Sequence, residues 1–480
     1  MTVYTGGGLV AKLPGPLEIY PLLPGTNCKE CGEANCMAFA TKMAEHTVKL
    51  EACTPLYEDP KYAKKLVKIE ELVTPPVREV TIGVGEFAAS IGAKLVLYRH
   101  DLRYTNPTSF FLDVPDNLDS EAFAKRVKEI EDWTYMYIGT NLRLDGIALR
   151  GVSQDPQTFA KAAKNLAGIS NWPIILCSLQ PEMLAAGAKA IADKRPLLYA
   201  ATLDTWAEVG EIAVRHNLPL VAYAPGNLDN LATLTNTLRA MGVEQLVLDP
   251  GTASKSGLGS TVNNFTQLRR SAIIKENELL GYPLLAAPIA VWADHREGEA
   301  PELTKWDEVL TAASLIVRYS DILILHSADM WTNLPLTFLR SNLYTDPVKP
   351  VAVEAGLQTF GDVDADSPVL YTTNFALTYF TVESDIKQAG VTTYLIVIDT
   401  EAMSVQTAVA GRKLTAEKVA ESLEETGIAD KVNHRILVSP GMAARISGET
   451  EEASNWTVKV GPKDSSGIGK YLQEGKWKEE

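Results

Sequence analysis

The chain has 480 residues, 46% hydrophobic and 22% charged, which is typical of a soluble globular protein with two or three domains. A formal net charge of -15 disfavours nucleic acid as a partner, because its phosphates would repel such a surface. No apolar run reaches the roughly 18 residues that cross a bilayer, and the N-terminus lacks a secretory signal, so we expect a cytoplasmic protein without a membrane partner.

Four of the five cysteines lie close together near the N-terminus. Cys28, Cys31, Cys36 and Cys53 follow the spacing C-x2-C-x4-C-x16-C within 26 residues. Four thiolates in such a run, with a glycine in the loop, suit a tetrahedral metal ion or an iron–sulfur cluster. The fifth, Cys177, ends an apolar stretch, and we expect it to be a small buried residue without a ligand role.

Two alternatives to a cluster remain open for this segment. A disulfide framework is the weaker one, because nothing indicates secretion and the chain is large and poor in cysteine. A structural zinc site usually has two C-x2-C pairs, whereas here one pair is followed by a third cysteine five residues on. The uneven spacing, with a distant fourth cysteine followed closely by proline, favours an iron–sulfur cluster over zinc.

A helix and a charged connector follow the first three cysteines. Apolar residues at helical spacing predict a helix over residues 37–46, which returns the chain to the fourth cysteine. His46 lies on this helix, but four cysteines already fill the site, so we predict a surface residue. Residues 1–57 are therefore predicted to be a cluster domain, and residues 58–79 a linker with a short amphipathic helix.

From residue 80 to residue 345, short apolar strands alternate with helical stretches. Strands that are apolar without alternation are buried on both faces, which indicates a parallel sheet. Eight such units over about 260 residues match a (β/α)8 TIM barrel, although a long open α/β sheet also fits the pattern. The predicted strands are residues 94–98, 146–149, 173–177, 196–199, 219–223, 245–249, 283–287 and 321–326.

Polar residues follow several of these strands, at the end of a barrel where active sites lie. Asp249, Thr252 and His326 are candidates for a substrate site. No nucleophile–base pair or metal triad is recognisable, and such residues also cap helices, so we assign no catalytic residue. The other strand-end residues considered are Arg99, His100, Asp101, Arg150, Ser178, Thr202, Asp294, His295 and Ser327.

A second α/β segment follows a linker predicted at residues 346–367. Residues 368–480 contain four more apolar strands with intervening helices, which predict a doubly wound, Rossmann-like parallel sheet. Open sheets of this kind bind ligands at the carboxyl edge, and small hydroxyls beside helix N-termini suit a large cofactor with amides and a phosphate. No GxGxxG or Walker motif favours a dinucleotide or a nucleoside triphosphate. Ordinary helix caps would explain any one of the strand-end loops, which are residues 372–374, 399–404, 439–442 and 461–467.

With these three parts in order, the chain resembles the large subunit of corrinoid iron–sulfur proteins, the gamma subunit of the acetyl-CoA decarbonylase/synthase complex. The most specific similarity is residues 23–40, LPGTNCKECGEANCMAFA, and the resemblance covers nearly the whole chain. Further similar segments are residues 80–86, 372–380, 399–405 and 460–468.

The resemblance implies a methyltransferase component with two cofactors. A 4Fe–4S cluster on Cys28, Cys31, Cys36 and Cys53 would reactivate Co(II) of a corrinoid. The corrinoid as Co(I) would accept a methyl group from a methyl-tetrahydropterin and exchange it with the nickel–iron site that makes or cleaves acetyl-CoA. The implied corrinoid contacts are Thr372, Thr373, Asn374, Thr400, Glu401, Ser404, Gly441, Ser465, Ser466 and Gly467.

The resemblance also implies partners. They are a small (delta) subunit, paired with this chain as a heterodimer, and the carbon monoxide dehydrogenase/acetyl-CoA synthase subunits. The barrel would then serve mainly in docking. Two other functions stay open, a tetrahydropterin-dependent methyltransferase whose barrel does the chemistry, and an iron–sulfur electron carrier or assembly subunit without corrinoid.

The sequence offers no axial histidine for a corrinoid. Many corrinoid domains supply one from a D-x-H-x-x-G loop, but here Glu401 stands at the nearest equivalent position. His434, the one histidine after residue 326, is predicted at the opposite end of its strand. We therefore predict a cobalt without a protein nitrogen ligand, with Thr400 and Ser404 at its lower face.

Overall fold

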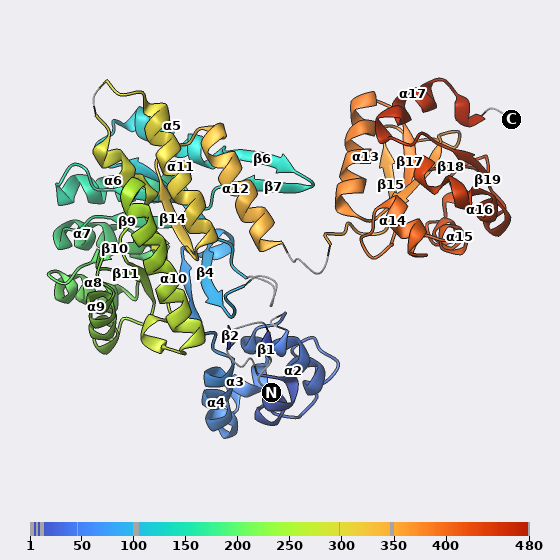
Figure 1. Ribbon diagram of the computed structural model, residues 1–480. Helices are drawn as coiled ribbons and strands as arrows, with labels where there is room; N and C mark the ends of the chain where they lie inside the picture. The colour runs from blue at the N-terminus through green and yellow to red at the C-terminus, as the bar shows by residue number, and fades with distance from the viewer. Residues whose placement is uncertain are drawn as a thin grey trace. The chain divides into compact units, whose positions relative to one another are not determined.

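The structure is a computed structural model that describes residues 4–5, 8–9, 14–45, 47–98, 105–296, 298–345 and 350–478. Its internal packing divides the chain into two units (Figure 1). The first unit comprises Met1–Tyr135 and Leu142–Tyr344, and the second comprises Met136–Asn141 and Thr345–Glu480. Within the described ranges, no helix has the length and apolar character needed to cross a membrane.

The cysteine segment folds into a small helical module with its own core. Helix α2 begins at Cys36 because the Asn35 side chain accepts a hydrogen bond from the Ala38 N–H at 2.8 Å, which is an N-cap. Buried Phe39 and Ile69 belong to the core of the module. The two predicted helices are therefore present, and the elements are β1 (Tyr4–Thr5), β2 (Gly8–Leu9), α1 (Pro16–Ile19), α2 (Cys36–Ala44), α3 (Thr54–Glu58) and α4 (Ala63–Val73).

An eight-stranded parallel sheet forms a nearly closed barrel, which confirms the barrel over the open sheet. The strand order is β12-β11-β10-β9-β8-β5-β14-β13, and a parallel bridge between Leu248 and Leu284 joins the two ends. The strands are β5 (Ser109–Pro115), β8 (Gly146–Arg150), β9 (Ile174–Cys177), β10 (Leu197–Ala201), β11 (Leu220–Tyr223), β12 (Leu246–Asp249), β13 (Leu285–Ala286) and β14 (Ile322–Leu325).

Helices surround these strands on the outside (Figure 1), and local sequence signals start several of them. The Asp119 and Asp155 side chains accept backbone N–H groups of the first turns of α5 and α6. Proline is the first residue of α6, α7 and α11, where its missing N–H is not needed. The helices are α5 (Ser120–Glu131), α6 (Pro156–Ile169), α7 (Pro181–Ile191), α8 (Trp206–His216), α9 (Leu228–Ala240), α10 (Leu258–Ile274), α11 (Pro301–Val317) and α12 (Met330–Tyr344).

The first barrel strand was predicted wrongly. Residues 94–98 are not a barrel strand, because Lys94 ends β4 (Ala89–Lys94), which pairs antiparallel with β3 (Val77–Ile82). Ile82 and Ile91 of this hairpin pack against the barrel interior, so the hairpin covers one end of the barrel. A second antiparallel pair, β6 (Thr134–Tyr137) and β7 (Thr140–Arg143), precedes β8 and was also not predicted.

The second unit contains a five-stranded sheet of order β15-β17-β16-β18-β19. The four predicted parallel strands are present, and β15 adds an antiparallel edge strand within residues expected to be a linker. The strands are β15 (Gly356–Phe360), β16 (Val369–Thr373), β17 (Thr393–Ile398), β18 (Ile436–Ser439) and β19 (Thr457–Val460).

Both faces of this sheet are covered. Leu370 and Leu395 pack with α13 and α17 on one face, and Tyr371 and Ile396 pack with α14 and α15 on the other. This explains why every residue of β17 is buried. The helices are α13 (Ala376–Ala389), α14 (Val405–Ala410), α15 (Ala416–Glu425), α16 (Ser447–Ser454) and α17 (Ile468–Gln473).

Candidate functional site

The structure brings the four N-terminal cysteines together. Cys28, Cys31, Cys36 and Cys53 all line one small cavity, beside Phe39 and other residues. Cys36 is the first residue of α2 and Cys53 directly precedes α3, so two helix starts hold two of the thiols. Cys36 and Cys53 are buried, Cys31 is half-buried and Cys28 is exposed, which leaves one side of the site open to a partner.

The loop that carries the first cysteines winds tightly around the cavity. Gly25, Asn27, Lys29 and Gly32 all have φ between 52° and 82°, in the left-handed region. The Asn27 side-chain oxygen accepts the backbone N–H of Cys36 at 2.9 Å, which ties this loop to the start of α2. His46 lies outside the described residues.

The thiols also influence one another. Burial raises the pKa of the Cys53 thiol, a hydrogen bond from the Leu56 backbone lowers it in part, and the Cys31 and Cys36 thiols raise it further. A bound metal deprotonates the thiols that coordinate it. The mutual effect shows that the four groups are close in space.

The cysteine geometry bears on the choice between one ion and a cluster. Across the described ranges, no group of three or more His, Cys, Asp or Glu side chains is placed to hold a metal ion. Ligands of a single zinc ion must converge on one atom at about 2.3 Å, whereas the cysteines of a cubane bind four different irons. The four thiols around one cavity are the donor set that a cluster needs, and the uneven spacing of the cysteines is what favours a cluster over zinc.

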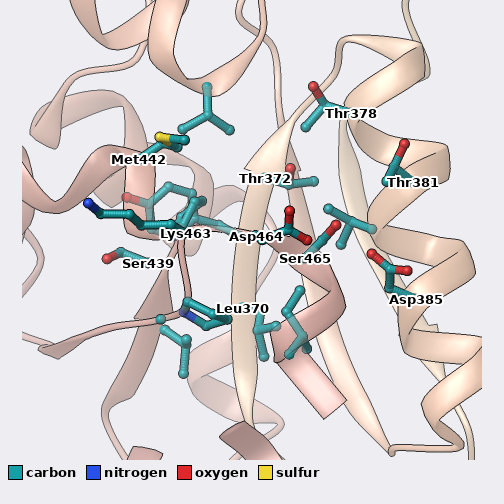
Figure 2. A pocket seen from close by; sticks show the side chains of 18 of the residues that line it. Leu370, Thr372, Thr378, Thr381, Asp385, Ser439, Met442, Lys463, Asp464 and Ser465 are labelled. Carbon is teal, nitrogen blue, oxygen red and sulfur yellow. The ribbon is translucent and has the colours of Figure 1, made fainter. Parts of the chain in front are cut away.

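A second cavity lies at the carboxyl edge of the sheet in the second unit, and we call it the carboxyl-edge cavity. Its volume is about 570 Å³, within the usual range for ligand sites. Leu370, Leu395 and Val438 give it an apolar floor. Figure 2 shows its polar walls, with one helix face on one side and the loops after β18 and β19 on the other. The polar lining residues include Thr372, Thr378, Thr381, Asp385, Ser404, Ser439, Lys463, Asp464, Ser465 and Ser466.

Four predicted residues line this cavity, namely Thr372, Ser404, Ser465 and Ser466. Thr373 does not, because it is fully buried at the end of β16. The remaining five predicted residues also lie at this edge of the sheet, but they are not among the residues that line the cavity.

Asn374 and Thr400 organise the loops beneath the cavity. The Asn374 side-chain oxygen accepts the backbone N–H groups of Thr400 and Ala402, each at 3.0 Å, and its Nδ2 donates to Asp399 at 2.9 Å. The Thr400 hydroxyl donates to the Met403 carbonyl at 3.0 Å, and the residue is fully buried. Thr400 therefore holds the loop in its conformation, and it is not among the residues that line the cavity.

Glu401 and two glycines also stand outside the lining. Glu401 is exposed and forms an ion pair with Lys413. A Cβ on Gly441 would lie 2.7 Å from the Lys463 nitrogen, and a Cβ on Gly467 would lie 2.9 Å from a carbon of Pro462. Gly441 therefore lets the loop after β18 pack closely against the loop after β19, and Gly467 lets the loop after β19 fold closely on itself, which shapes one wall of the cavity.

Two buried hydroxyls beside the cavity lack a hydrogen-bond partner among the residues that the structure describes. They are Tyr371 Oη and Ser439 Oγ, whose residues are 3% and 1% exposed. Burial raises the pKa of Tyr371, and the nearby Ser439 hydroxyl lowers it in part, although the two form no hydrogen bond of good geometry. Buried hydroxyls without partners cost about 1–3 kcal/mol each, so a ligand or water in the cavity would satisfy them.

The one histidine of the second unit lies at the other edge of the sheet. The His434 ring lies at the amino ends of β16 and β18, with Nε2 3.0 Å from the Ser367 carbonyl oxygen and the ring against Trp477. The sequence has no other histidine beyond residue 326. This agrees with the predicted position of His434 and leaves the carboxyl-edge cavity without an imidazole.

The barrel candidates separate into two polar clusters. His326 Nδ1 lies 2.6 Å from Asp113 Oδ1, and Arg150 Nε donates to the other Asp113 oxygen at 2.8 Å. Asp249 instead accepts the Tyr199 hydroxyl at 2.9 Å, and burial raises the pKa of Asp249 to about 7. Asp113 was missed because its strand was not predicted.

Other barrel residues have structural roles. Thr252 accepts the Ala287 N–H at 2.9 Å, and Ser178 and Thr202 accept N–H groups of the loops that follow them. Cys177 is half-buried and burial raises the pKa of its thiol. The predicted candidates Arg99, His100 and Asp101 lie outside the described residues.

Comparison with known families identifies similar proteins along the whole chain. A family model described as "CO dehydrogenase/acetyl-CoA synthase delta subunit" matches residues 79–472, and one described as "Putative Fe-S cluster" matches residues 23–55. The gamma subunit of the acetyl-CoA decarbonylase/synthase complex of Methanosarcina acetivorans is 46% identical over 466 residues, which cover 96% of this chain and 98% of that protein.

Two further similarities are more distant. The corresponding gamma subunit of Archaeoglobus fulgidus is 43% identical over 467 residues, covering 96% of this chain and 98% of that one. Among solved structures, dihydropteroate synthase from Thermus thermophilus has a TM-score of 0.38 and 15% identity, covering 55% of this chain and 100% of that chain.

Proposed function

Because this chain belongs to the family of acetyl-CoA decarbonylase/synthase complex gamma subunits, we propose that it is the methyl carrier of such a complex. It accepts a methyl group from a methyl-tetrahydropterin and exchanges it with the acetyl-CoA synthase site. The observation that supports this most directly is the presence of two separate ligand sites, the four-cysteine cavity and the carboxyl-edge cavity.

The N-terminal module is the site of an iron–sulfur cofactor, and we propose one 4Fe–4S cluster bound by Cys28, Cys31, Cys36 and Cys53. Such a cluster supplies single electrons at low potential. The chain's part is to hold four thiolates around one cavity, and the left-handed loop and the two helix starts fix three of them in place. The exposed Cys28 side gives an electron route to the surface.

The second unit, with residues 368–480, serves as a doubly wound, Rossmann-like corrinoid domain. A bound corrinoid supplies a cobalt ion whose reduced form is the nucleophile for the methyl group. The apolar floor of the carboxyl-edge cavity suits the flat base of a nucleotide tail, while Lys463, Ser465 and Ser466 suit its phosphate and ribose. The unpaired hydroxyls of Tyr371 and Ser439 are the kind of group that such a ligand would satisfy.

The loop after β17 would lie at the lower face of the cobalt. Ser404 lines the cavity, and Asn374 and Thr400 hold the loop in position from below. None of the described residues that line the cavity is a histidine, so we propose that the cobalt has no protein nitrogen ligand. A weaker lower ligand makes the reduction that the cluster drives easier.

The barrel, taken as residues 80–345, would dock partner subunits. Leu303, Trp306 and Leu310 recur at i, i+3 and i+7 along α11 and are 69%, 53% and 45% exposed. A stripe of large exposed apolar side chains of this kind marks an interaction surface. We assign it to the small (delta) subunit, in a heterodimer that joins the carbon monoxide dehydrogenase/acetyl-CoA synthase subunits.

A second candidate function is favoured by one barrel observation. Asp249, with a pKa raised to about 7, could give a proton to the amine that a tetrahydropterin retains when its methyl group leaves. The barrel would then be a methyltransferase in its own right. An Asp249→Asn variant that blocks methyl transfer to free cobalamin would support this function over simple docking.

Elemental analysis and absorption spectroscopy of the anaerobically purified full chain test the main proposal. We expect about four irons and one cobalt per chain, with a corrinoid spectrum. Iron without cobalt would support an electron carrier instead, and one zinc without iron would overturn the cluster assignment.

A further inference from the structure

One face of α13 is directed at the carboxyl-edge cavity. Thr378, Thr381 and Asp385 are spaced i, i+3 and i+7, so they lie on one side of the helix. Figure 2 shows their polar ends along the same wall, with Asp385 farthest along the helix. The cavity therefore has a carboxylate at one end of an otherwise hydroxyl-bearing wall.

Asp385 differs from the acidic side chains nearby, Asp464 and Glu383, in having no partner among the described residues. Asp464 also lines the cavity, and it accepts the Ser466 backbone N–H at 3.0 Å. Glu383 accepts a hydrogen bond from Lys387 at 2.8 Å, one turn along the helix. For Asp385, no hydrogen bond or ion pair to another described residue is found, although the residue is half-buried. Val382, three residues before Asp385 on α13, also lines the cavity, as does Leu395.

A ligand that fills the cavity would displace water from the Asp385 carboxylate, so a favourable ligand must supply a hydrogen-bond donor in its place. The phosphate of a ligand cannot be that partner, because two negative groups repel. Figure 2 shows Lys463 on the other side of β16 from Asp385, and the Asp464 carboxylate on the same side of β16 as Asp385, so the cavity has a cation at one side and carboxylates at the other. A ligand that fits this polarity has an anionic group near Lys463 and an N–H or O–H donor near Asp385.

We propose that Asp385 accepts a hydrogen bond from an N–H or O–H group on the terminal base of the corrinoid tail, and so selects among corrinoids by their base. This inference rests on the proposed corrinoid function. Bases with a donor on the ring edge bind more tightly than bases of the same shape without one. Asp385 is a specificity residue for the cofactor, and it takes no part in methyl transfer.

Binding of matched corrinoids to the full chain, purified without corrinoid, tests the proposal. Two pairs are used, adeninyl against purinyl cobamide, and 5-hydroxybenzimidazolyl against 5-methylbenzimidazolyl cobamide. Cobinamide, which has no base, measures binding of the ring alone. Dissociation constants come from absorbance titration, so no catalytic activity is needed.

We expect the wild-type chain to prefer the donor-bearing member of at least one pair by about tenfold or more, as for a hydrogen bond to a charged acceptor. Asp385→Ala should reduce that preference to about onefold, and Asp385→Asn, which keeps a neutral acceptor, should give an intermediate value. The control Glu383→Ala removes a carboxylate from the same helix outside the cavity and should keep the wild-type preference.

The possible results distinguish the role of Asp385 from the corrinoid function itself. If cobamides bind and the preference is absent in the wild type or unchanged in Asp385→Ala, the role of Asp385 is wrong while the corrinoid function stands. If no cobamide and no cobinamide binds, the corrinoid function itself is wrong. A loss of cobinamide binding in Asp385→Ala would show damage to the fold and would also overturn a base-specific role.

Discussion

The side-chain oxygen of Asn374 accepts the backbone N–H of Thr400 at 3.0 Å, and so joins the loops that follow two neighbouring strands of the second unit. The same oxygen accepts the Ala402 N–H, and the Asn374 amide donates to Asp399. One side chain thus fixes the loop that carries Glu401 and Ser404, which is the loop we place at the lower face of the cobalt.

Replacing Asn374 should therefore destabilise the second unit. Asn374 is 5% exposed, and Asn374→Ala removes the acceptor of two backbone N–H groups. We therefore expect a loss of about 2–4 kcal/mol in the free energy of unfolding. Urea denaturation measures it. The exposed Asn433→Ala should change stability by less than about 0.5 kcal/mol, and an equal loss in both variants would contradict the role of Asn374.

The cysteine site predicts a separation between methyl transfer and reactivation. Cys31→Ala removes one ligand of the proposed cluster, so methyl transfer from pre-reduced Co(I) should continue while recovery from Co(II) should stop. Stopped-flow absorbance follows both reactions. Cys177→Ala, in the barrel, should affect neither, and loss of transfer from Co(I) in Cys31→Ala would show that the cluster has another task.

The sequence was sufficient for the parts whose chemistry is local. The cysteine spacing identified all four thiols that line one cavity. Seven of the eight barrel strands were predicted correctly, each from an apolar run that is followed by a helix. Strand β5 was not predicted because Asp113 interrupts its apolar pattern. Asp113 can be buried because Arg150 and His326, which come from other parts of the barrel, form hydrogen bonds with its carboxylate. Partners so distant in sequence leave no local signal.

The carboxyl-edge cavity shows the same limit. Loop composition pointed to Ser404, Ser465 and Ser466, which line it. It could not separate them from Asn374 and Thr400, which are also small polar residues but form hydrogen bonds within the protein. The polar face of α13 was not predicted, because the candidate residues were taken only from the loops at strand ends. The spacing of Thr378, Thr381 and Asp385 on one side of the helix was nevertheless a usable signal.

The apolar stripe on α11 predicts where the small subunit docks. Trp306→Glu places a charge in the middle of that stripe and should weaken the heterodimer by at least tenfold, since buried tryptophans often dominate interface energies. Sedimentation of the co-expressed subunits measures this. Val214→Glu alters an exposed apolar residue of α8 and should leave assembly unchanged, and equal effects of the two variants would remove the stripe from the interface.

Asp249 should make stability depend on pH. Burial raises the pKa of Asp249 from 3.8 to about 7, so the folded chain favours the neutral carboxylic acid. The contribution of this group to the free energy of unfolding is therefore complete below about pH 4 and is lost as the pH rises to about 7. The shift corresponds to about 4 kcal/mol at most. Urea unfolding of wild type and Asp249→Asn across this range should show a difference that grows with pH, whereas exposed Asp204→Asn should track the wild type.

The absence of a histidine at the carboxyl edge predicts the spectrum of the bound corrinoid. Electron paramagnetic resonance of its Co(II) state should show no splitting of the cobalt lines by an axial nitrogen, because His434 is held at the opposite edge by the Ser367 carbonyl. His434→Ala should therefore leave the spectrum unchanged. Glu401→His puts an imidazole into the loop near Ser404, and new nitrogen splitting in that variant would place the loop beneath the metal. Splitting already present in the wild type would disprove the nitrogen-free cobalt, and loss of that splitting in His434→Ala would identify the ligand.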